Sequence, residues 1–186
     1  HKEYRRQRQM CIRDSNKIAA TYYYHQLKSE AGKSGLDYLV KRGLSDKTIN
    51  SFGLGYAPQS TGELYRMLKD KGYDDGILKE SGLFTYEKGV RDKFWNRVIF
   101  PIMDINNKVI GFGGRVMGDA KPKYLNSPET KLFDKSRNLY GLNAARTARK
   151  NNLIICEGYM DVISLHQAGF TQAVASLGTA LTPGHA

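Results

Sequence analysis

Cysteine, acidic residues and long apolar runs are all scarce in this sequence. Only two of its 186 residues are cysteines, Cys11 and Cys156, so the chain can build neither a framework of several disulfides nor a zinc site with four cysteine ligands. This cysteine usage indicates a reduced, cytoplasmic protein. The longest aliphatic run beside a predicted strand covers residues 153–156, far short of the roughly 20 residues that cross a bilayer, so we expect no membrane partner.

The shortage of acidic residues leaves the chain strongly basic. Asp and Glu number 18 against 29 Lys and Arg, which gives a formal net charge of +11. Such a charge favours a polyanionic partner, first nucleic acid and then nucleotides. Apolar residues make up 40% of the chain, which is enough to bury the core of one medium domain or two small ones.

The first 15 residues are basic and lack the apolar centre of a signal peptide. They are either a nucleic-acid-binding arm or a tail that is non-native or frayed, and we favour the tail because no core-facing period is visible. The segment holds five basic and two acidic residues, so eight of the eleven net positive charges belong to the rest of the chain. The prediction of a polyanionic partner therefore does not depend on residues 1–15.

Apolar spacing predicts a small helical region in the first half of the chain. Residues 18–57 carry apolar positions at helical spacing, interrupted by turn residues, which indicates short helices with short connections. Ser45 is a candidate N-cap for one of them. We expect further helices at residues 63–71 and 75–81.

The second half begins with the pattern of a β-hairpin. Residues alternate over positions 97–102, two asparagines at 106–107 tolerate positive φ, and a second apolar run covers 108–116. The polar stretch 121–138 is predicted to be a long loop, a kind of segment that is more often functional than idle. A helix is expected at residues 144–150.

A β-α-β unit is predicted near the end of the chain. Residues 153–158 begin with an apolar run, residues 159–167 have a helical period that stops at Gly169, and residues 173–176 are apolar again. We expect a buried parallel strand on each side of the helix.

Glu157 carries the strongest chemical signal in this unit. It ends the apolar strand and is followed at once by Gly158 and the helix, which places it at the carboxyl edge of a parallel sheet, where α/β proteins bind ligands. A carboxylate at such a place binds a cation, for which Mg²⁺ with its preference for oxygen ligands is suited, or it caps the helix. Spacing alone leaves both readings open. Asp161, in the first turn, is by itself more typical of a residue that stabilises the helix dipole.

A set of basic residues lies on or beside the predicted hairpin and loop. Taken singly, each is typical of a solvated surface charge. Together with a neighbouring tyrosine and asparagine, they have the chemistry to bind a triphosphate and to stack on a nucleic-acid strand. The set comprises Arg97, Arg115, Lys123 and Lys135, with Tyr124 and Asn126.

Seven short motifs follow one another along the chain. They are Tyr38-Leu39-Val40-Lys41-Arg42-Gly43-Leu44-Ser45, Gly55-Tyr56-Ala57-Pro58, Arg97-Val98-Ile99-Phe100-Pro101-Ile102, Gly111-Phe112-Gly113-Gly114-Arg115, Pro122-Lys123-Tyr124-Leu125-Asn126-Ser127-Pro128-Glu129-Thr130, Leu139-Tyr140-Gly141 and Glu157-Gly158-Tyr159-Met160-Asp161-Val162. In this order they resemble bacterial replicative DNA primases of the DnaG type. The resemblance extends from about residue 18 to the end of the chain.

The resemblance implies an RNA polymerase core in which an N-terminal basic subdomain is joined to a TOPRIM subdomain that holds divalent metal ions. It places a catalytic, metal-binding acidic residue on Glu157 and a second acidic residue on Asp161. It also implies catalytic roles for Lys123 and Lys135. Nucleotide and template binding fall on Arg97, Arg115, Lys123, Tyr124 and Asn126.

The resemblance also implies cofactors and partners. These are Mg²⁺ or Mn²⁺, ribonucleoside triphosphates, a single-stranded DNA template, zinc in an N-terminal domain, and a replicative helicase bound through a C-terminal domain. Neither of these two domains is expected in the chain, and His1 and Cys11 lie in the expected tail and cannot serve as the zinc site. We expect the Asp-x-Asp metal pair of the family to lie beyond Ala186, so the chain alone should be inactive.

The expected fold class combines α+β and α/β structure. A basic tail at residues 1–15 precedes a helical and β-hairpin subdomain of the primase core at 16–150, and the truncated start of a TOPRIM β-α-β domain occupies 151–186. The predicted function is DNA-directed synthesis of short RNA primers for replication. The alternatives are the primase half of a phage primase-helicase and a non-catalytic nucleic-acid-binding TOPRIM protein.

Overall fold

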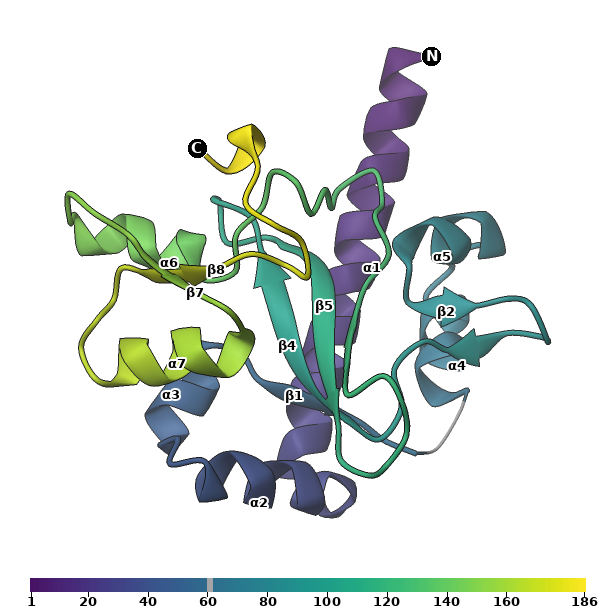
Figure 1. The fold of residues 1–186 in the computed structure, drawn as a ribbon. Helices are drawn as coiled ribbons and strands as arrows, with labels where there is room; N and C mark the ends of the chain where they lie inside the picture. Colours follow the sequence, from purple (N-terminus) through teal and green to yellow (C-terminus); the bar gives the residue numbers. More distant parts are fainter. Residues whose placement is uncertain (60–61) are drawn as a thin grey trace.

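A four-stranded antiparallel sheet lies at the centre of the computed structural model, which describes residues 1–59 and 62–186 (Figure 1). Its strand order is β1-β4-β5-β6. The strands are β1 (Gly55–Ala57), β4 (Arg97–Met103), β5 (Val109–Val116) and β6 (Tyr124–Asn126). The β4–β5 pair is the hairpin predicted from the alternating pattern, and Asn107 in its turn has the expected positive φ of 60°.

Both faces of this sheet are covered, so β4 is buried along almost its whole length. Val98 and Phe100 point into one core, which they share with Leu39 and Ile49 of the helical region and with the β-α-β unit. Ile99 points to the opposite face and packs with Phe112 against α1 (Lys2–Lys28). The alternation in the sequence therefore separates two buried faces here rather than a buried face from a solvated one.

The N-terminal segment differs from the expected tail. Residues 1–15 were predicted to be a frayed or non-native tail, but α1 is one continuous helix that begins at Lys2. Its buried positions follow helical spacing and begin inside the segment, at Ile12. They are Ile12, Ser15, Asn16, Ala19, Tyr23 and Leu27. The continuous helix excludes the frayed alternative, and its period only becomes visible when Ile12 is aligned with the apolar positions after residue 18. That the segment is non-native stays a prediction.

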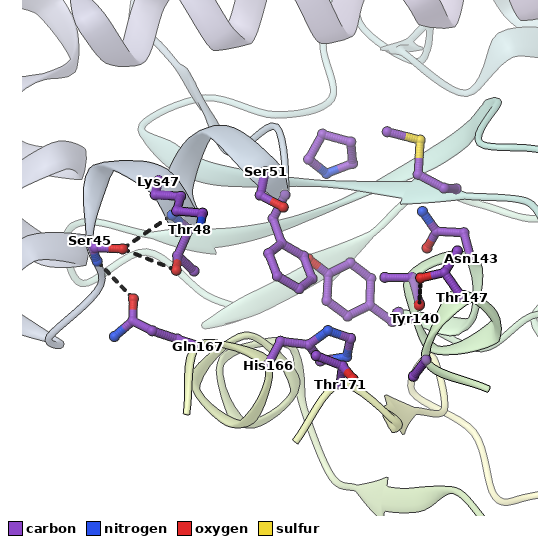
Figure 2. Close-up of a pocket in the computed structure, with 16 residues that line it drawn as sticks. Ser45, Lys47, Thr48, Ser51, Tyr140, Asn143, Thr147, His166, Gln167 and Thr171 are labelled. Carbon is purple, nitrogen blue, oxygen red and sulfur yellow. Dashed lines mark hydrogen bonds between the residues drawn. The ribbon is translucent and has the colours of Figure 1, made fainter. Parts of the chain in front are cut away.

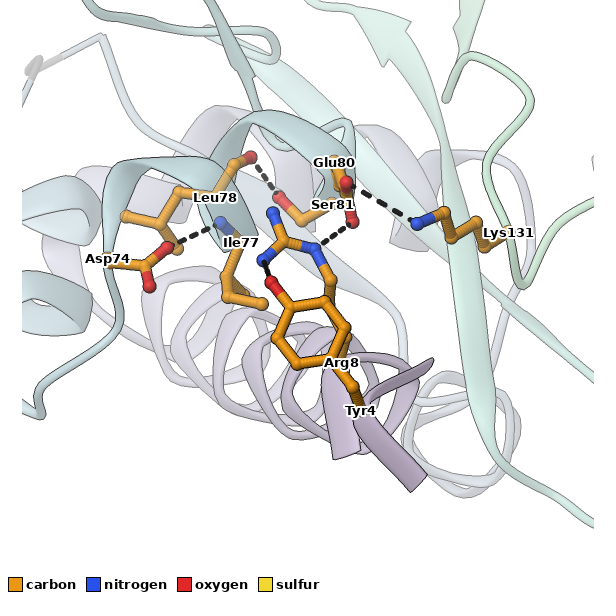
Figure 3. A network of polar contacts seen from close by, with 8 residues as sticks. All are labelled: Tyr4, Arg8, Asp74, Ile77, Leu78, Glu80, Ser81 and Lys131. Atoms are coloured by element: carbon orange, nitrogen blue, oxygen red, sulfur yellow. Dashed lines mark hydrogen bonds and ion pairs between the residues drawn. The ribbon is translucent and has the colours of Figure 1, made fainter. Parts of the chain in front are cut away.

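A polar network holds the first half of α1 against α5 (Asp75–Ser81) (Figure 3). The Arg8 guanidinium donates to the Glu80 carboxylate at 2.9 Å and to the Tyr4 hydroxyl at 3.2 Å. Lys131 lies 3.5 Å from the other Glu80 oxygen. Because such partly exposed ion pairs contribute only about 0–1 kcal/mol each, the network orients the helix, and the burial of Ile12 provides more of the stabilisation.

Short helices form the rest of the first half, as predicted. The Ser45 side chain accepts a hydrogen bond from the Thr48 N–H at 3.2 Å and so caps its helix. The helices after α1 are α2 (Lys33–Lys41), α3 (Asp46–Ser51), α4 (Glu63–Asp70) and α5. A two-stranded sheet of β2 (Phe84–Thr85) and β3 (Arg91–Asp92) follows them.

Two segments depart from their predicted form. The stretch 121–138 is not wholly a loop, because residues Tyr124–Asn126 form β6 and pair with β5. The expected helix at 144–150 begins earlier, as α6 (Leu142–Ala145), and ends in a 3-10 turn at Arg146–Ala148. In the first case a tertiary contact decided the outcome, because the polar residues of β6 become a strand by pairing with the edge of β5.

The predicted β-α-β unit is present. β7 (Ile154–Cys156) and β8 (Ala173–Ala175) pair in parallel and are connected by α7 (Tyr159–Gln167). The expectation of two buried strands holds only for β8, because Ile155 in β7 is 50% exposed. β8 lies between β7 and a bridge to Tyr140, whereas β7 has a pairing partner on one side only.

One amide side chain of the β-α-β unit forms hydrogen bonds with the helical region, beside the apolar core that the two parts share. Gln167 accepts from the Ser45 N–H at 2.8 Å and donates to the Gly43 carbonyl at 2.8 Å. Both groups belong to the turn between α2 and α3, so the end of α7 satisfies backbone groups more than 120 residues away in sequence.

Among the helices in the described ranges, none combines the length and apolar character that crossing a bilayer requires.

Asp92 in β3 is a carboxylate held in an unfavourable place. One of its oxygens is buried without a hydrogen-bond partner in the described ranges. Burial raises the pKa of Asp92 to about 6, and the nearby Glu63 adds to the rise. Because the unfolded value is about 3.9, the charge costs stability as the pH rises from about 4 to about 6.

We expect Asp92→Asn to raise the free energy of unfolding by about 1–2 kcal/mol at pH 7.5 and to change it little at about pH 3, where the wild-type carboxyl is largely protonated in both states. Urea unfolding at the two pH values measures this. Asp119→Asn, at an exposed aspartate, is the control and should have no effect at either pH. Equal stability of Asp92→Asn and wild type at pH 7.5 would contradict the expectation.

Candidate functional site

A cleft of about 340 Å³ opens at the carboxyl ends of β7 and β8. Such an edge of a parallel sheet is where α/β units bind ligands. Four of the predicted site residues line it together. Tyr124 and Asn126 come from β6, Glu157 from the loop after β7, and Asp161 from α7. The lining residues that matter here are Arg42, Tyr124, Asn126, Glu157, Tyr159 and Asp161.

Glu157 and Asp161 are the carboxylates of this cleft. Both side chains are exposed, Glu157 directly after β7 and Asp161 in the first turn of α7. Gly158 is the N-cap of α7, and no side chain caps this helix, so the alternative role of Glu157 as a helix cap is not the one observed. Within residues 1–59 and 62–186, no group of three or more His, Cys, Asp or Glu side chains is placed to hold a metal ion. The cleft contains two carboxylates, Glu157 and Asp161, and carboxylate oxygens are the metal ligands that Mg²⁺ prefers.

Asn126 joins the cleft from β6. Its side-chain oxygen accepts a hydrogen bond of 2.6 Å from the Tyr159 hydroxyl. Tyr159 is the first residue of α7, two positions after Glu157. This hydrogen bond therefore connects the segment that carries Glu157 to the central sheet. Burial raises the pKa of Tyr159 well above its usual range, and the hydroxyl remains a proton donor at any physiological pH.

A stacked group of side chains forms the basic wall next to the cleft. The Arg115 guanidinium carbon lies 4.6 Å from the centroid of the Tyr38 ring, a cation–π distance. Arg42 donates to the Tyr38 hydroxyl at 3.4 Å. Burial and the neighbouring Tyr38 raise the pKa of the half-exposed Tyr124. Arg115 is thus held by an aromatic ring beside the cleft, with part of its charge accessible.

Tyr38 and Arg42 were not predicted as site residues. They are four positions apart on α2 and its end, so one helix face presents both. The signal was in the sequence, because both belong to the first of the seven motifs. It could not be read without knowing that α2 ends against the cleft.

Arg97 is placed differently from the other predicted cations. It is 3% exposed, and its guanidinium donates to the carbonyls of Pro122 at 2.8 Å, Gly114 at 3.2 Å and Lys123 at 3.3 Å. Burial lowers the pKa of Arg97. The side chain therefore holds the backbone of the segment that carries Lys123, whose own side chain is exposed.

Lys135 does not line the cleft. It lies in the loop after β6, where its carbonyl pairs with the His185 ring at 2.8 Å. Lys93 is close to it: burial lowers the pKa of Lys93, and the charges of Lys135 and Arg97 lower it further. Lys93 was not among the predicted site residues, and nothing in the pattern around it pointed to a place beside Lys135 and Arg97.

A larger cavity of about 550 Å³ lies between α3, α6 and α7 (Figure 2). Phe52, Tyr140 and His166 form its aromatic part, and the His166 ring contacts Phe52 edge-on at 5.3 Å. None of the predicted site residues lines it. Since it holds no carboxylate and only one lysine, Lys47, the smaller cleft has the chemistry that the sequence predicts.

The fold and the cleft define a two-part α+β protein, in which part of a carboxylate-bearing β-α-β unit is attached to a basic sheet domain. The chain belongs to the family described as the DNA primase catalytic core, N-terminal domain, whose model matches residues 22–146. A Toprim domain model matches residues 151–186. The predicted resemblance and fold class are thereby confirmed.

Individual relatives agree with this membership. The chain is 53% identical over 169 residues to the DNA primase of Clostridium acetobutylicum, which covers 90% of this chain and 28% of that protein. It is similar to a DnaG primase catalytic domain solved bound to single-stranded DNA, with 40% identity, a TM-score of 0.90, and coverage of 96% and 57%. It is also similar to the primase of Aquifex aeolicus, solved with its zinc-binding and RNA polymerase domains. The sequence identity is 36% and the TM-score 0.84, and the match covers 95% of this chain and 44% of that chain. The chain thus spans less than a third of the length of the first of these relatives.

The geometry around Arg97 predicts a difference between two neighbouring basic residues. Arg97→Met keeps much of the apolar length but leaves three buried carbonyls without their donor, so we expect the free energy of unfolding to fall by about 1–3 kcal/mol. Lys123→Ala, at an exposed side chain, should change it by less than about 0.5 kcal/mol. Thermal unfolding of both variants tests this, and equal melting temperatures would contradict it.

Proposed function

We propose that the chain is part of a DNA primase that synthesises short RNA primers on single-stranded DNA from ribonucleoside triphosphates. The observation that carries the proposal is the cleft itself, in which Glu157 and Asp161 meet Tyr124 and Asn126 at the carboxyl edge of β7 and β8. Membership of the primase family and the similarity to a relative solved with single-stranded DNA support it. The whole protein would act in the cytoplasm.

Nucleotidyl transfer requires an aligned 3′-hydroxyl and neutralisation of the triphosphate charge. Mg²⁺ or Mn²⁺, when bound, supplies this alignment and charge neutralisation. Glu157, with Asp161, would hold the metal from this chain. Other domains of the protein would supply the zinc site and the contact with the replicative helicase.

The cationic residues divide the remaining tasks by position. Arg42 at the cleft and Arg115 in the stacked wall would bind phosphate oxygens of the incoming nucleotide. Tyr124, 41% exposed, offers a ring on which a base can stack. Lys123 would hold the leaving pyrophosphate, and Lys135 with Lys93 would bind phosphates farther along the strand. Arg97 contributes through the backbone that it holds.

In the full-length protein, we expect Glu157→Gln to reduce primer synthesis more than a hundredfold, a loss of about 2.7 kcal/mol or more, with template binding nearly intact. The substitution keeps the size of the side chain and removes the charge that a metal needs. A gel assay with labelled ribonucleotides, Mg²⁺ or Mn²⁺ and a single-stranded template measures it. Glu129→Gln, an exposed glutamate outside the cleft, is the matched control. Synthesis by Glu157→Gln within about tenfold of wild type would overturn the role of Glu157.

The 186-residue chain should bind single-stranded DNA in a salt-dependent manner and form no primers, because its described residues provide only two cleft carboxylates. With about three phosphate contacts, affinity should fall roughly tenfold to twentyfold between 50 and 200 mM salt. Lys123→Ala should make the logarithmic slope about 0.7 shallower. Lys150→Ala, an exposed lysine beyond α6, should leave it unchanged. Fluorescence anisotropy with oligo(dT) measures the slope. Binding that does not depend on salt would contradict the proposal that these cations bind the phosphates of the strand.

A further inference from the structure

The Tyr159 ring is held in one position by three neighbours. It stacks on Phe100 with centroids 4.8 Å apart and an interplanar angle of 6°, and Tyr140 contacts it edge-on at 4.6 Å. Its third neighbour is the backbone of Gly113, where any Cβ would overlap the ring. The direction of the hydroxyl is therefore set by packing and not by the ligand.

This fixed hydroxyl determines which way the Asn126 amide faces. Tyr159 is buried, and in the part of the chain that the structure describes its proton has one acceptor, the Asn126 side-chain oxygen at 2.6 Å. Turning the amide over would place NH₂ against the hydroxyl and leave the buried proton without an acceptor, which is costly. The amide oxygen is thus occupied by Tyr159.

The other end of Asn126 faces the cleft. Its nitrogen lies beside Gly178, on the side of the cleft formed by the end of β8, close enough that a Cβ at Gly178 would approach it to 3.2 Å. Hydrogen bonds of this NH₂ group are absent from the described part of the chain. Asn126 consequently presents donors and no acceptor to whatever enters the cleft.

We infer that Tyr159 is a positioning residue that makes Asn126 a donor-only contact for a phosphate oxygen of the substrate. This rests on the proposed function, which brings a nucleoside triphosphate and a DNA strand to the cleft. A phosphate oxygen accepts hydrogen bonds and donates none, so it matches the NH₂ face of Asn126. Arg42 in the same cleft adds the positive charge that a phosphate requires.

A double-mutant cycle in the full-length protein tests the inference. Binding of inorganic triphosphate with Mg²⁺ is measured by calorimetry for wild type, Tyr159→Phe, Asn126→Ala and the double variant. Tyr159→Phe should weaken binding roughly fivefold to tenfold, the usual value of one hydrogen bond. In the Asn126→Ala background it should have no further effect, because Tyr159 acts through Asn126. In primer synthesis the loss should fall on the KM for ribonucleotide, with kcat within about twofold.

Two further variants separate positioning from packing. Tyr140→Phe removes a buried hydroxyl that has no partner in the described ranges, on a ring that touches Tyr159, and should leave triphosphate binding unchanged. Asn126→Asp keeps an acceptor for Tyr159 but replaces the NH₂ donors by a carboxylate oxygen, and should weaken binding at least as much as Asn126→Ala. Repeating the cycle with oligo(dT) alone shows whether the nucleotide or the strand supplies the phosphate.

Additive effects of Tyr159→Phe and Asn126→Ala would overturn the inference, as would wild-type binding by Asn126→Asp or an equal loss in Tyr140→Phe. Coupling between the two residues in a full-length protein that makes no primers would support the positioning role and refute the proposed function. Primer synthesis by the wild type, with no coupling between Tyr159 and Asn126, would support the proposed function and refute the positioning role.

Discussion

The contact of the Tyr159 ring with Phe100 and the Gly113 backbone is the interaction on which the site depends. An aromatic side chain buries about 150–250 Å², which at roughly 25 cal/mol per Å² corresponds to about 4–6 kcal/mol as an upper bound. Gly113 lets the ring approach β5 this closely. Because Glu157 is two residues before Tyr159, the same contact brings the carboxylate beside a strand that belongs to the other part of the chain.

The basic residues of the chain act in physically different ways that a net charge conceals. Arg97 is buried and donates its hydrogen bonds to backbone carbonyls. It therefore holds the segment beside the cleft without lining the cleft itself. Arg115 is stacked on Tyr38 and donates to the Val116 carbonyl, and these two contacts restrict its motion beside the cleft. Lys123 is exposed, on the segment whose backbone Arg97 holds. The side of the cleft thus combines packed cations with an exposed lysine on the adjoining segment.

Much of the fold was predictable because it follows local periodicity. The β4–β5 hairpin, the Ser45 cap and the β7-α7-β8 unit each follow from signals within a few residues: alternation and turn residues, a capping side chain, and apolar runs on both sides of a helical period. The failures have a common cause. The first turns of α1 and the strand β6 are polar stretches that gain their structure from contacts with partners far along the chain, and no local period records those contacts.

The sequence by itself determined the family, the order of the elements and the position of Glu157 at the carboxyl edge of a parallel strand. A strand that ends in an acidic residue before a helix can place it nowhere else. Only the tertiary structure decided that Arg97 is a buried scaffold, that Arg42 lines the cleft, and that the Asn126 amide faces it with its NH₂ group. The physical reason is that burial and hydrogen-bond direction depend on neighbours brought together by packing, which residue spacing along the chain does not encode.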